Sequence, residues 1–309
     1  MAAPKRKAQT RAAARQGMRP ARGTGSGSHG PVQRRPASRG RGWRPPGMVL
    51  GISGGVVAIV VLIVILGISS TSGAFAAPLL PAPASLVHTV TSVPTSAFDA
   101  VGRGNAAVPP TKITGAEMRH DGKPEMLFIG AEYCPYCALA RWGLVAALSR
   151  FGHFRNLHTI RSSSVDVFPN TATFSFFGAH YTSRYLSFVP VEHQTNIPGS
   201  GIYASGTLLQ GLTAQQNRLW SRYGGGGYPF IDVGGRYAQG PVVPDNLVAD
   251  INGRSWDAIA ADLGRPSTGA AKDILGEANL YTAEICKLTG ERPAAVCRSS
   301  GVAAASTGL

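Results

Sequence analysis

Acidic residues are scarce in this chain, and they are missing altogether from its beginning. The 309 residues hold 16 Asp and Glu against 30 Lys and Arg. Residues 1–47 contain twelve of the basic residues and no acid, among many Gly, Pro, Ala and Ser. Such a composition cannot bury a core, so we predict a disordered basic tail over 1–47. Residues 48–309 are nearly neutral. The net charge therefore gives no reason to expect nucleic acid as a partner of the folded part.

Long apolar runs are also rare, and one is long enough to cross a bilayer. Residues 48–68 are 21 uncharged residues, and a spanning helix needs about 20. Twelve positive charges precede the run, and the next Lys or Arg is Arg103. The positive-inside rule then places 1–47 in the cytoplasm and the rest outside. A cleavable signal peptide is the alternative, because Ala74, Phe75 and Ala76 match an A-x-A site. The length of the run favours an uncleaved single-pass anchor in the cell membrane.

Cysteine is scarce too. The chain has four, and all of them follow the predicted span, on the side where disulfides persist. Cys134 and Cys137 form a Cys-x-x-Cys, whereas Cys286 and Cys297 are eleven residues apart and do not form a second one. This spacing disfavours a four-cysteine zinc site. We predict a structural disulfide between Cys286 and Cys297, with a second redox pair as the alternative, and we expect no metal and no cofactor.

The Cys-x-x-Cys lies where a strand should pass into a helix. Residues 126–130 are an apolar run without a breaker, and 137–151 carry apolar residues at helical spacing. One side of this helix holds Leu139, Trp142, Val145 and Leu148, and Arg141 and Arg150 are expected to face water.

That position predicts a chemistry. Cys134 would cap the helix, where unpaired N–H groups and the positive end of the helix dipole favour a thiolate. Such a setting lowers a cysteine pKa from roughly 8.5 into the range of about 3.5–7.5. Pro135 suits the first helical turn. We therefore predict Cys134 as the attacking thiolate and Cys137, one turn further in, as the shielded resolving thiol. A structural disulfide and half of a zinc site are the alternatives.

The tetrapeptide Cys134-Pro135-Tyr136-Cys137 in this setting resembles the thioredoxin superfamily, and its residues are similar to those of glutaredoxins. In that superfamily a cis-proline begins the strand after the middle helix and faces the cysteine pair, and Pro229 matches that place. The resemblance implies that clients bind along Tyr133, Pro135, Tyr136, Tyr228 and Pro229, like an added strand. These proteins usually carry a buried acid six residues before the first cysteine. Here that residue is Phe128, and the nearby Glu132 is expected to point elsewhere.

A second resemblance is more specific. Three serines at 162–164, Asp166, the run Pro169-Asn170-Thr171 and the run Thr173-Phe174-Ser175-Phe176 resemble the family called domain of unknown function 929. The match extends over about 98–297. It implies a thioredoxin-like fold and a redox role, without a known substrate.

The predicted organisation is an α/β chain in five parts. After the tail and the span come a Pro, Ser, Thr and Ala-rich stalk over 69–97, a thioredoxin-like domain over 98–298 and a disordered tail over 299–309. Within the domain we expect a second strand at 157–160, parallel to the first, and an inserted hairpin of 173–177 with 181–191. We also expect helices at 114–120, 206–223, 255–263 and 270–288. The helix at 255–263 would close the thioredoxin unit, and the helix at 270–288 is a C-terminal extension.

Two functions from different classes fit these features. The first is a membrane-anchored thiol–disulfide oxidoreductase outside the cytoplasm, acting through Cys134 and Cys137 on thiols or disulfides of exported proteins and recharged by a membrane redox enzyme. The second is a thioredoxin-like protein-binding module of the cell envelope, in which Cys134 and Cys137 form a permanent structural bridge. Solvent access to Cys134 and its thiol pKa separate the two.

Overall fold

The computed structural model describes residues 79–106, 109–197, 206–241 and 243–309. The predicted basic tail and the predicted membrane span lie outside these ranges. None of the helices within them has the length and apolar composition that a bilayer crossing requires.

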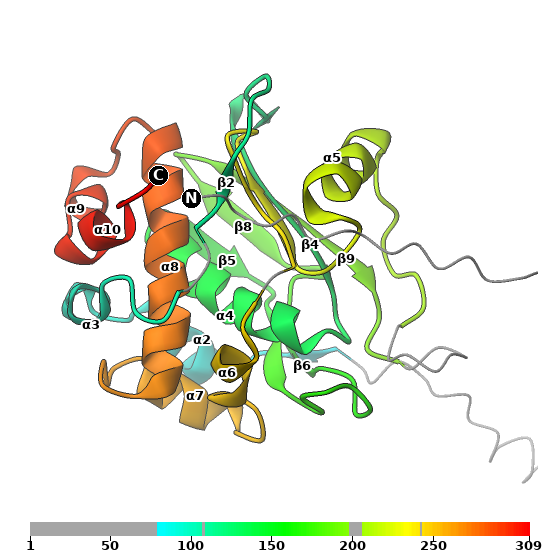
Figure 1. The fold of residues 1–309 in the computed structure, drawn as a ribbon. Helices are drawn as coiled ribbons and strands as arrows, with labels where there is room; N and C mark the ends of the chain where they lie inside the picture. The colour runs from blue at the N-terminus through cyan, green and yellow to red at the C-terminus, as the bar shows by residue number, and fades with distance from the viewer. Residues whose placement is uncertain (1–78, 107–108, 198–205, 242) are drawn as a thin grey trace, which may run out of the picture. The chain divides into compact units, whose positions relative to one another are not determined.

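A mixed sheet forms the centre of this α/β fold (Figure 1). Its middle strand is β4, Lys123–Ala131, the run predicted before the cysteines. β4 pairs in parallel with β9 on one side and antiparallel with β10 on the other. The remaining strands continue the sheet beyond β10 or pair with the start of β4. The strands are β2 (Thr111–Lys112), β3 (Arg119–His120), β9 (Ser187–Gln194), β10 (Phe230–Val233) and β11 (Tyr237–Gln239).

Side chains of β4 alternate between two apolar layers, as the period of a strand requires. Met126 and Phe128 join the larger core, formed with α4 (Pro135–Leu148) and α8 (Gly269–Leu288). Leu127 and Ile129 join a smaller core beneath α5 (Ala214–Gly224). Figure 1 shows α5 on the opposite side of the sheet from α4 and α8. With both faces covered, β4 is buried from Glu125 onward.

α4 and α8 approach each other closely, and a glycine makes this possible. A Cβ at Gly143 would lie 3.2 Å from Cε2 of Tyr281 and 3.3 Å from Cβ of Glu277. A side chain at this position would force Tyr281 and Glu277 to shift by a few tenths of an ångström. The contact fixes α8 beside the helix that carries both cysteines.

The strand pairing of residues 152–191 differs from the prediction. β6 (His158–Arg161) forms where the second strand was expected, but it pairs antiparallel with β1 (Leu80–Pro81) and β7 (Ala172–Ser175) in a separate sheet. The parallel partner of β4 is β9 instead. The expected hairpin does not form either, since β8 (His180–Ser183) pairs with β5 (Gly152–Arg155). The aromatic side chains here pack on one another, for example Phe176 on Phe188.

Helices of the core match the prediction more closely than the segments at either end. α5 and α8 are present, although α5 begins eight residues later than expected. The prediction of a helix at 114–120 is wrong, because the end of this range, Arg119–His120, forms strand β3. The predicted stalk is folded from residue 80 onward, and the predicted C-terminal tail contains a helix with buried Val302 and Ala305. The shorter helices are α2 (Ala84–Thr91), α3 (Thr95–Val101), α6 (Asp245–Ala249), α7 (Trp256–Asp262), α9 (Ala294–Cys297) and α10 (Ser300–Ala305).

Candidate functional site

Cys134 caps the N-terminus of α4, as predicted. Its backbone is extended, Pro135 follows inside the first turn, and its Sγ accepts a hydrogen bond from the backbone N–H of Cys137 at 3.3 Å. The first N–H groups of a helix have no partner within the helix. Here one of them is satisfied by a sulfur atom, an arrangement that favours the thiolate over the thiol.

The two thiols differ in burial and in pKa. Cys134 is 5% exposed and Cys137 is fully buried, and the two are not bonded to each other. Burial acts to raise the pKa of Cys134, but hydrogen bonds from the side chain and backbone of Cys137, with the nearby charge of Arg141, lower it below its ordinary value. Burial and the Cys134 sulfur raise the pKa of Cys137 well above its ordinary value. This asymmetry makes Cys134 the more acidic of the two thiols and keeps Cys137 protonated.

A buried cluster of charged side chains lies behind the cysteines, and the sequence reasoning missed it. Arg141 does not face water but is fully buried, and its guanidinium binds the carboxylate of Glu192 on β9 and the carbonyl oxygen of Ala131. Glu132 is 4% exposed and accepts a hydrogen bond from Ser175 at 2.7 Å. Burial and the charge of Glu192 raise the pKa of Glu132. Arg141 thus places a buried positive charge near both sulfur atoms.

The segment before β10 forms the other wall of the site. The peptide bond between Tyr228 and Pro229 is cis, as expected from the position of Pro229. The Cys134 Sγ lies 3.9 Å from the carbonyl oxygen of Tyr228. The Tyr133 and Tyr228 rings meet edge to face with centroids 6.3 Å apart. Burial and then the Cys134 charge raise the pKa of Tyr133 to about 12, and both rings are half-buried.

Tyr136 is held away from this ring pair. Its hydroxyl donates a 2.6 Å hydrogen bond to Asp245 at the start of α6, and its ring meets that of Phe168 edge to face. Of the five residues predicted to contact clients, Tyr133 directly precedes Cys134, and Tyr228, joined to Pro229 by the cis bond, brings its carbonyl oxygen to the Cys134 sulfur. Pro135 is buried inside the first turn of α4, and Tyr136 forms a separate contact.

Two aromatic residues that the sequence did not single out extend the site. Trp220 of α5 stacks on Tyr228, with centroids 5.2 Å apart and planes 22° apart, and His193 of β9 lies 5.5 Å from the Trp220 ring. The Trp220 indole N–H donates to the carbonyl oxygen of Gly227 at 2.7 Å. A helical pattern over α5 predicts that Trp220 faces the sheet, but not which ring it meets.

Cys286 and Cys297 form the predicted disulfide, which joins the end of α8 to α9. They lie with Glu291 in a group that has the residue types of a metal site, within the described ranges. Both sulfur atoms are used in the disulfide, however, and a coordinating cysteine must be a thiolate. The disulfide joins the end of α8 to α9, and its structural role stays a prediction.

Comparison with known proteins gives a family but no activity. The sequence model of the family described as "Domain of unknown function (DUF929)" matches residues 109–287, which include β4, both site cysteines and Pro229. No curated protein and no solved structure matches this chain.

Proposed function

The chain belongs to the family Domain of unknown function (DUF929), and we propose from its geometry that it is a thiol–disulfide oxidoreductase. The observation that carries the proposal is the hydrogen bond from the Cys137 N–H to the Cys134 sulfur at the start of α4. The lowered pKa of Cys134 and the raised pKa of Cys137 support the same proposal. A nucleophilic thiolate beside a protonated thiol is the pair that disulfide exchange needs.

The proposal includes a thioredoxin-like fold. The order β4, α4, β9, α5, β10, β11 and α8 supports it, because the cysteine helix follows the first strand and the cis-proline precedes the strand after the middle helix. In this arrangement α8, rather than the segment at 255–263, is the closing helix, since α8 packs against α4. The intervening strands β5 to β8 are then an insertion between α4 and β9.

The exchange proceeds in two balanced steps. The Cys134 thiolate attacks one sulfur of a client disulfide, so that a Cys134–client bond forms while the second client sulfur leaves as a thiolate. Cys137 then loses its proton and attacks the Cys134 sulfur, which forms the Cys134–Cys137 disulfide and releases the first client sulfur. The client is reduced by two electrons and the protein is oxidised. The same steps in reverse oxidise a client dithiol.

The proton of Cys137 must leave in the second step, and Tyr281 with Glu277 on α8 offers a route. The Tyr281 hydroxyl donates a 2.6 Å hydrogen bond to Glu277. Burial, the charge of Glu277 and the charge of Cys137 all raise the pKa of Tyr281, and Tyr281 belongs to the same buried core cluster as Cys137. Both residues line a cavity of about 230 Å³ together with Pro229. Tyr281 is buried in the core cluster that holds Cys137, and both Tyr281 and Glu277 reach the cavity, so this pair is the route that we propose for the proton.

We also propose that the site works outside the cytoplasm on cysteines of exported proteins, with the chain anchored by 48–68 and recharged by a membrane redox enzyme. The apolar run and the charge bias of the sequence support this placement. The Cys286–Cys297 disulfide supports it independently, because such bonds persist in oxidising compartments.

Trapping of the mixed disulfide tests the proposal. In the full-length Cys137→Ser variant the second step is blocked, so exported proteins should accumulate on Cys134 and be identified by mass spectrometry. A matched Cys134→Ser variant should capture none. Equal capture by the two variants, or capture by neither, overturns the catalytic role.

The protein-binding module remains the second candidate, because one observation favours it. Cys134 is only 5% exposed, and a binding role does not require solvent access to its sulfur; the permanent bridge of this alternative is not formed in the structure, where both cysteines are free. The redox potential of the Cys134–Cys137 pair decides between the two. Structural disulfides lie below about −300 mV, whereas catalysts lie between about −270 and −120 mV.

A further inference from the structure

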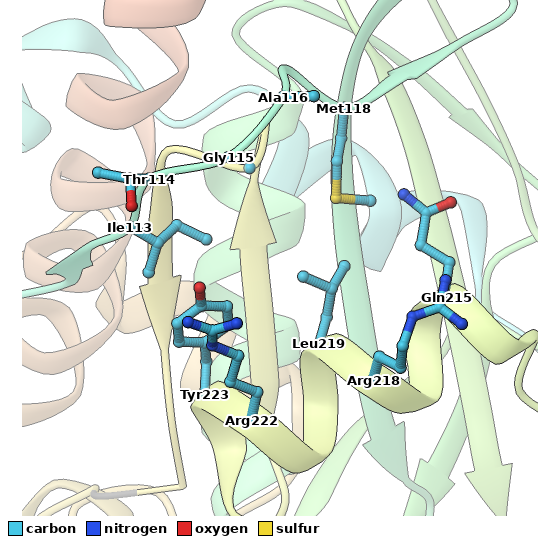
Figure 2. Close-up of a pocket in the computed structure, with 11 residues that line it drawn as sticks. Ile113, Thr114, Gly115, Ala116, Met118, Gln215, Arg218, Leu219, Arg222 and Tyr223 are labelled. Carbon is cyan, nitrogen blue, oxygen red and sulfur yellow. The ribbon is translucent and has the colours of Figure 1, made fainter.

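A cavity of about 330 Å³ lies between α5 and the segment that joins β2 to β3 (Figure 2). Met118 of that segment is hydrogen-bonded to Glu125 near the start of β4, whereas Cys134 follows the end of the same strand. The cavity and the thiol site therefore lie at opposite ends of β4. None of the residues that line the cavity contributes to the site described above.

The interior of the cavity is apolar. Figure 2 shows Ile113 and Met118 reaching toward α5, with Leu219 and Tyr223 rising to meet them. Ile113 and Met118 are 8% and 9% exposed, and Leu219 and Tyr223 are half-buried. Together they form an apolar surface that faces the cavity. The volume falls in the range of about 300–1,000 Å³ that is typical of small-molecule sites.

The open side of the cavity is positively charged. Gln215, Arg218 and Arg222 stand on α5 at intervals of three and four residues, so they share one helix face. No acid lines the cavity, and Glu117 in the facing segment is paired with Arg119 at 3.0 Å.

Neither Arg218 nor Arg222 forms an ion pair with any residue of the described ranges. Two like charges at i and i+4 destabilise a helix. Both side chains are exposed, and Arg222 lies over the Tyr223 ring, 5.2 Å from its centroid, so the repulsion is small; a bound anion between the two guanidinium groups would relieve it.

We propose that this cavity binds a small amphipathic anion, with an apolar body and one carboxylate or phosphate group. The apolar body occupies the space between Met118 and Leu219. The anionic group lies at the rim, where Arg218 and Arg222 supply planar donors that match carboxylate and phosphate geometry. This inference does not depend on the proposed redox activity, so either can fail without the other.

A titration of the full-length protein with phenylbutyrate tests the proposal, with isotope-labelled methionine methyl groups as the reporter. The Met118 methyl resonance should shift and saturate, while that of Met126, which packs on the opposite face of the sheet, should not move. The Arg218→Gln/Arg222→Gln variant should bind at least tenfold more weakly. The matched Arg184→Gln/Arg298→Gln variant removes two exposed arginines elsewhere and should bind like the unmodified protein.

Three results would overturn the proposal. The first is a Met118 resonance that does not respond to phenylbutyrate. The second is equal affinity for the neutral phenylbutanamide, which would mean that charge plays no part. The third is a peptide of Glu and Leu that shifts Met118 at lower concentration than phenylbutyrate, which would make the groove a peptide site.

Leu219→Gln is a second variant that weakens the apolar contact and retains both arginines. It should also bind more weakly, which keeps the test decisive if the double variant is unstable.

Discussion

The guanidinium of Arg141 holds the carboxylate of Glu192 with hydrogen bonds of 2.9 and 2.6 Å, and neither side chain is exposed to solvent. Removal of one partner leaves the other as an uncompensated buried charge, which costs about 3–5 kcal/mol. We therefore expect Arg141→Met to lower the free energy of unfolding by about that amount in urea denaturation.

The double variant Arg141→Met/Glu192→Leu provides the control, because it removes both charges. It should be more stable than Arg141→Met alone, since no charge is left unpaired. The losses of unfolding free energy in Arg141→Met and Glu192→Leu should not add. A double variant that loses their sum would contradict the coupling between the two side chains.

A second prediction concerns the acidity of Cys134. Burial raises its pKa, and the hydrogen bond from the Cys137 side chain is the largest of the opposing effects. Cys137→Ala should therefore raise the pKa of Cys134, while the hydrogen bond from the backbone N–H of residue 137 remains. Thiolate absorbance as a function of pH measures the shift, with Cys134→Ser as the blank. An unchanged titration in Cys137→Ala would show that the backbone and Arg141 alone set the pKa.

The local part of the site was predictable from the sequence, since its chemistry depends on neighbours along the chain. The apolar run, the cysteine and the proline predict a strand, an N-cap and a first helical turn, and these are what form. The Cys286–Cys297 disulfide was predictable for a similar reason, since the other two cysteines are committed to the Cys-x-x-Cys.

The long-range part was not predictable. Both β6 and β9 read as apolar strands, and their periodicity does not say which one pairs with β4. Arg141 is the clearest case, because a charged residue in a helix is expected to face water. Its partner Glu192 lies 51 residues later, on the strand that was assigned to a hairpin. A buried ion pair of this kind is found only once the strand order is known.

Access to Cys134 leads to a third prediction. The Tyr133 and Tyr228 rings meet beside a sulfur on a residue that is 5% exposed. Tyr133→Ala should open this contact and increase the rate at which iodoacetamide alkylates Cys134 at fixed pH by several-fold. Tyr136→Ala is the control, because Tyr136 is held by Asp245 away from the ring pair. An equal increase in both variants would mean that general loosening, rather than the ring pair, governs access.

A fourth prediction concerns the release of the Cys137 proton. Glu277 accepts a hydrogen bond from the Tyr281 hydroxyl, and burial raises the pKa of the Glu277 carboxyl. Glu277→Gln cannot take up a proton, so resolution of the Cys134–client disulfide should slow about tenfold. The first step, attack by Cys134, should keep its rate.

Rapid-mixing kinetics on a model disulfide separate the two steps. Tyr281→Phe, which removes only the hydroxyl, should behave like Glu277→Gln. Glu284 is a buried acid of the same helix whose carboxylate accepts a hydrogen bond from Gln239 and none from Tyr281, so Glu284→Gln is the matched control. Slowing of the first step in Glu277→Gln would point to a change of structure instead of a lost proton acceptor.

The last prediction is a dependence of stability on pH. Glu284 is fully buried, and burial raises its pKa from 4.5 to about 8. Between those values the folded protein keeps a proton that the unfolded chain has released. The retained proton contributes to the free energy of unfolding. This contribution is complete below pH 4.5 and is lost as the pH rises through 8, at about 1.4 kcal/mol per pH unit. Glu284→Gln mimics the neutral carboxyl and should flatten the slope in urea denaturation by about that amount. The exposed Glu291→Gln should leave the slope unchanged, and an unaltered slope in Glu284→Gln would mean that Glu284 is ionised in the folded protein.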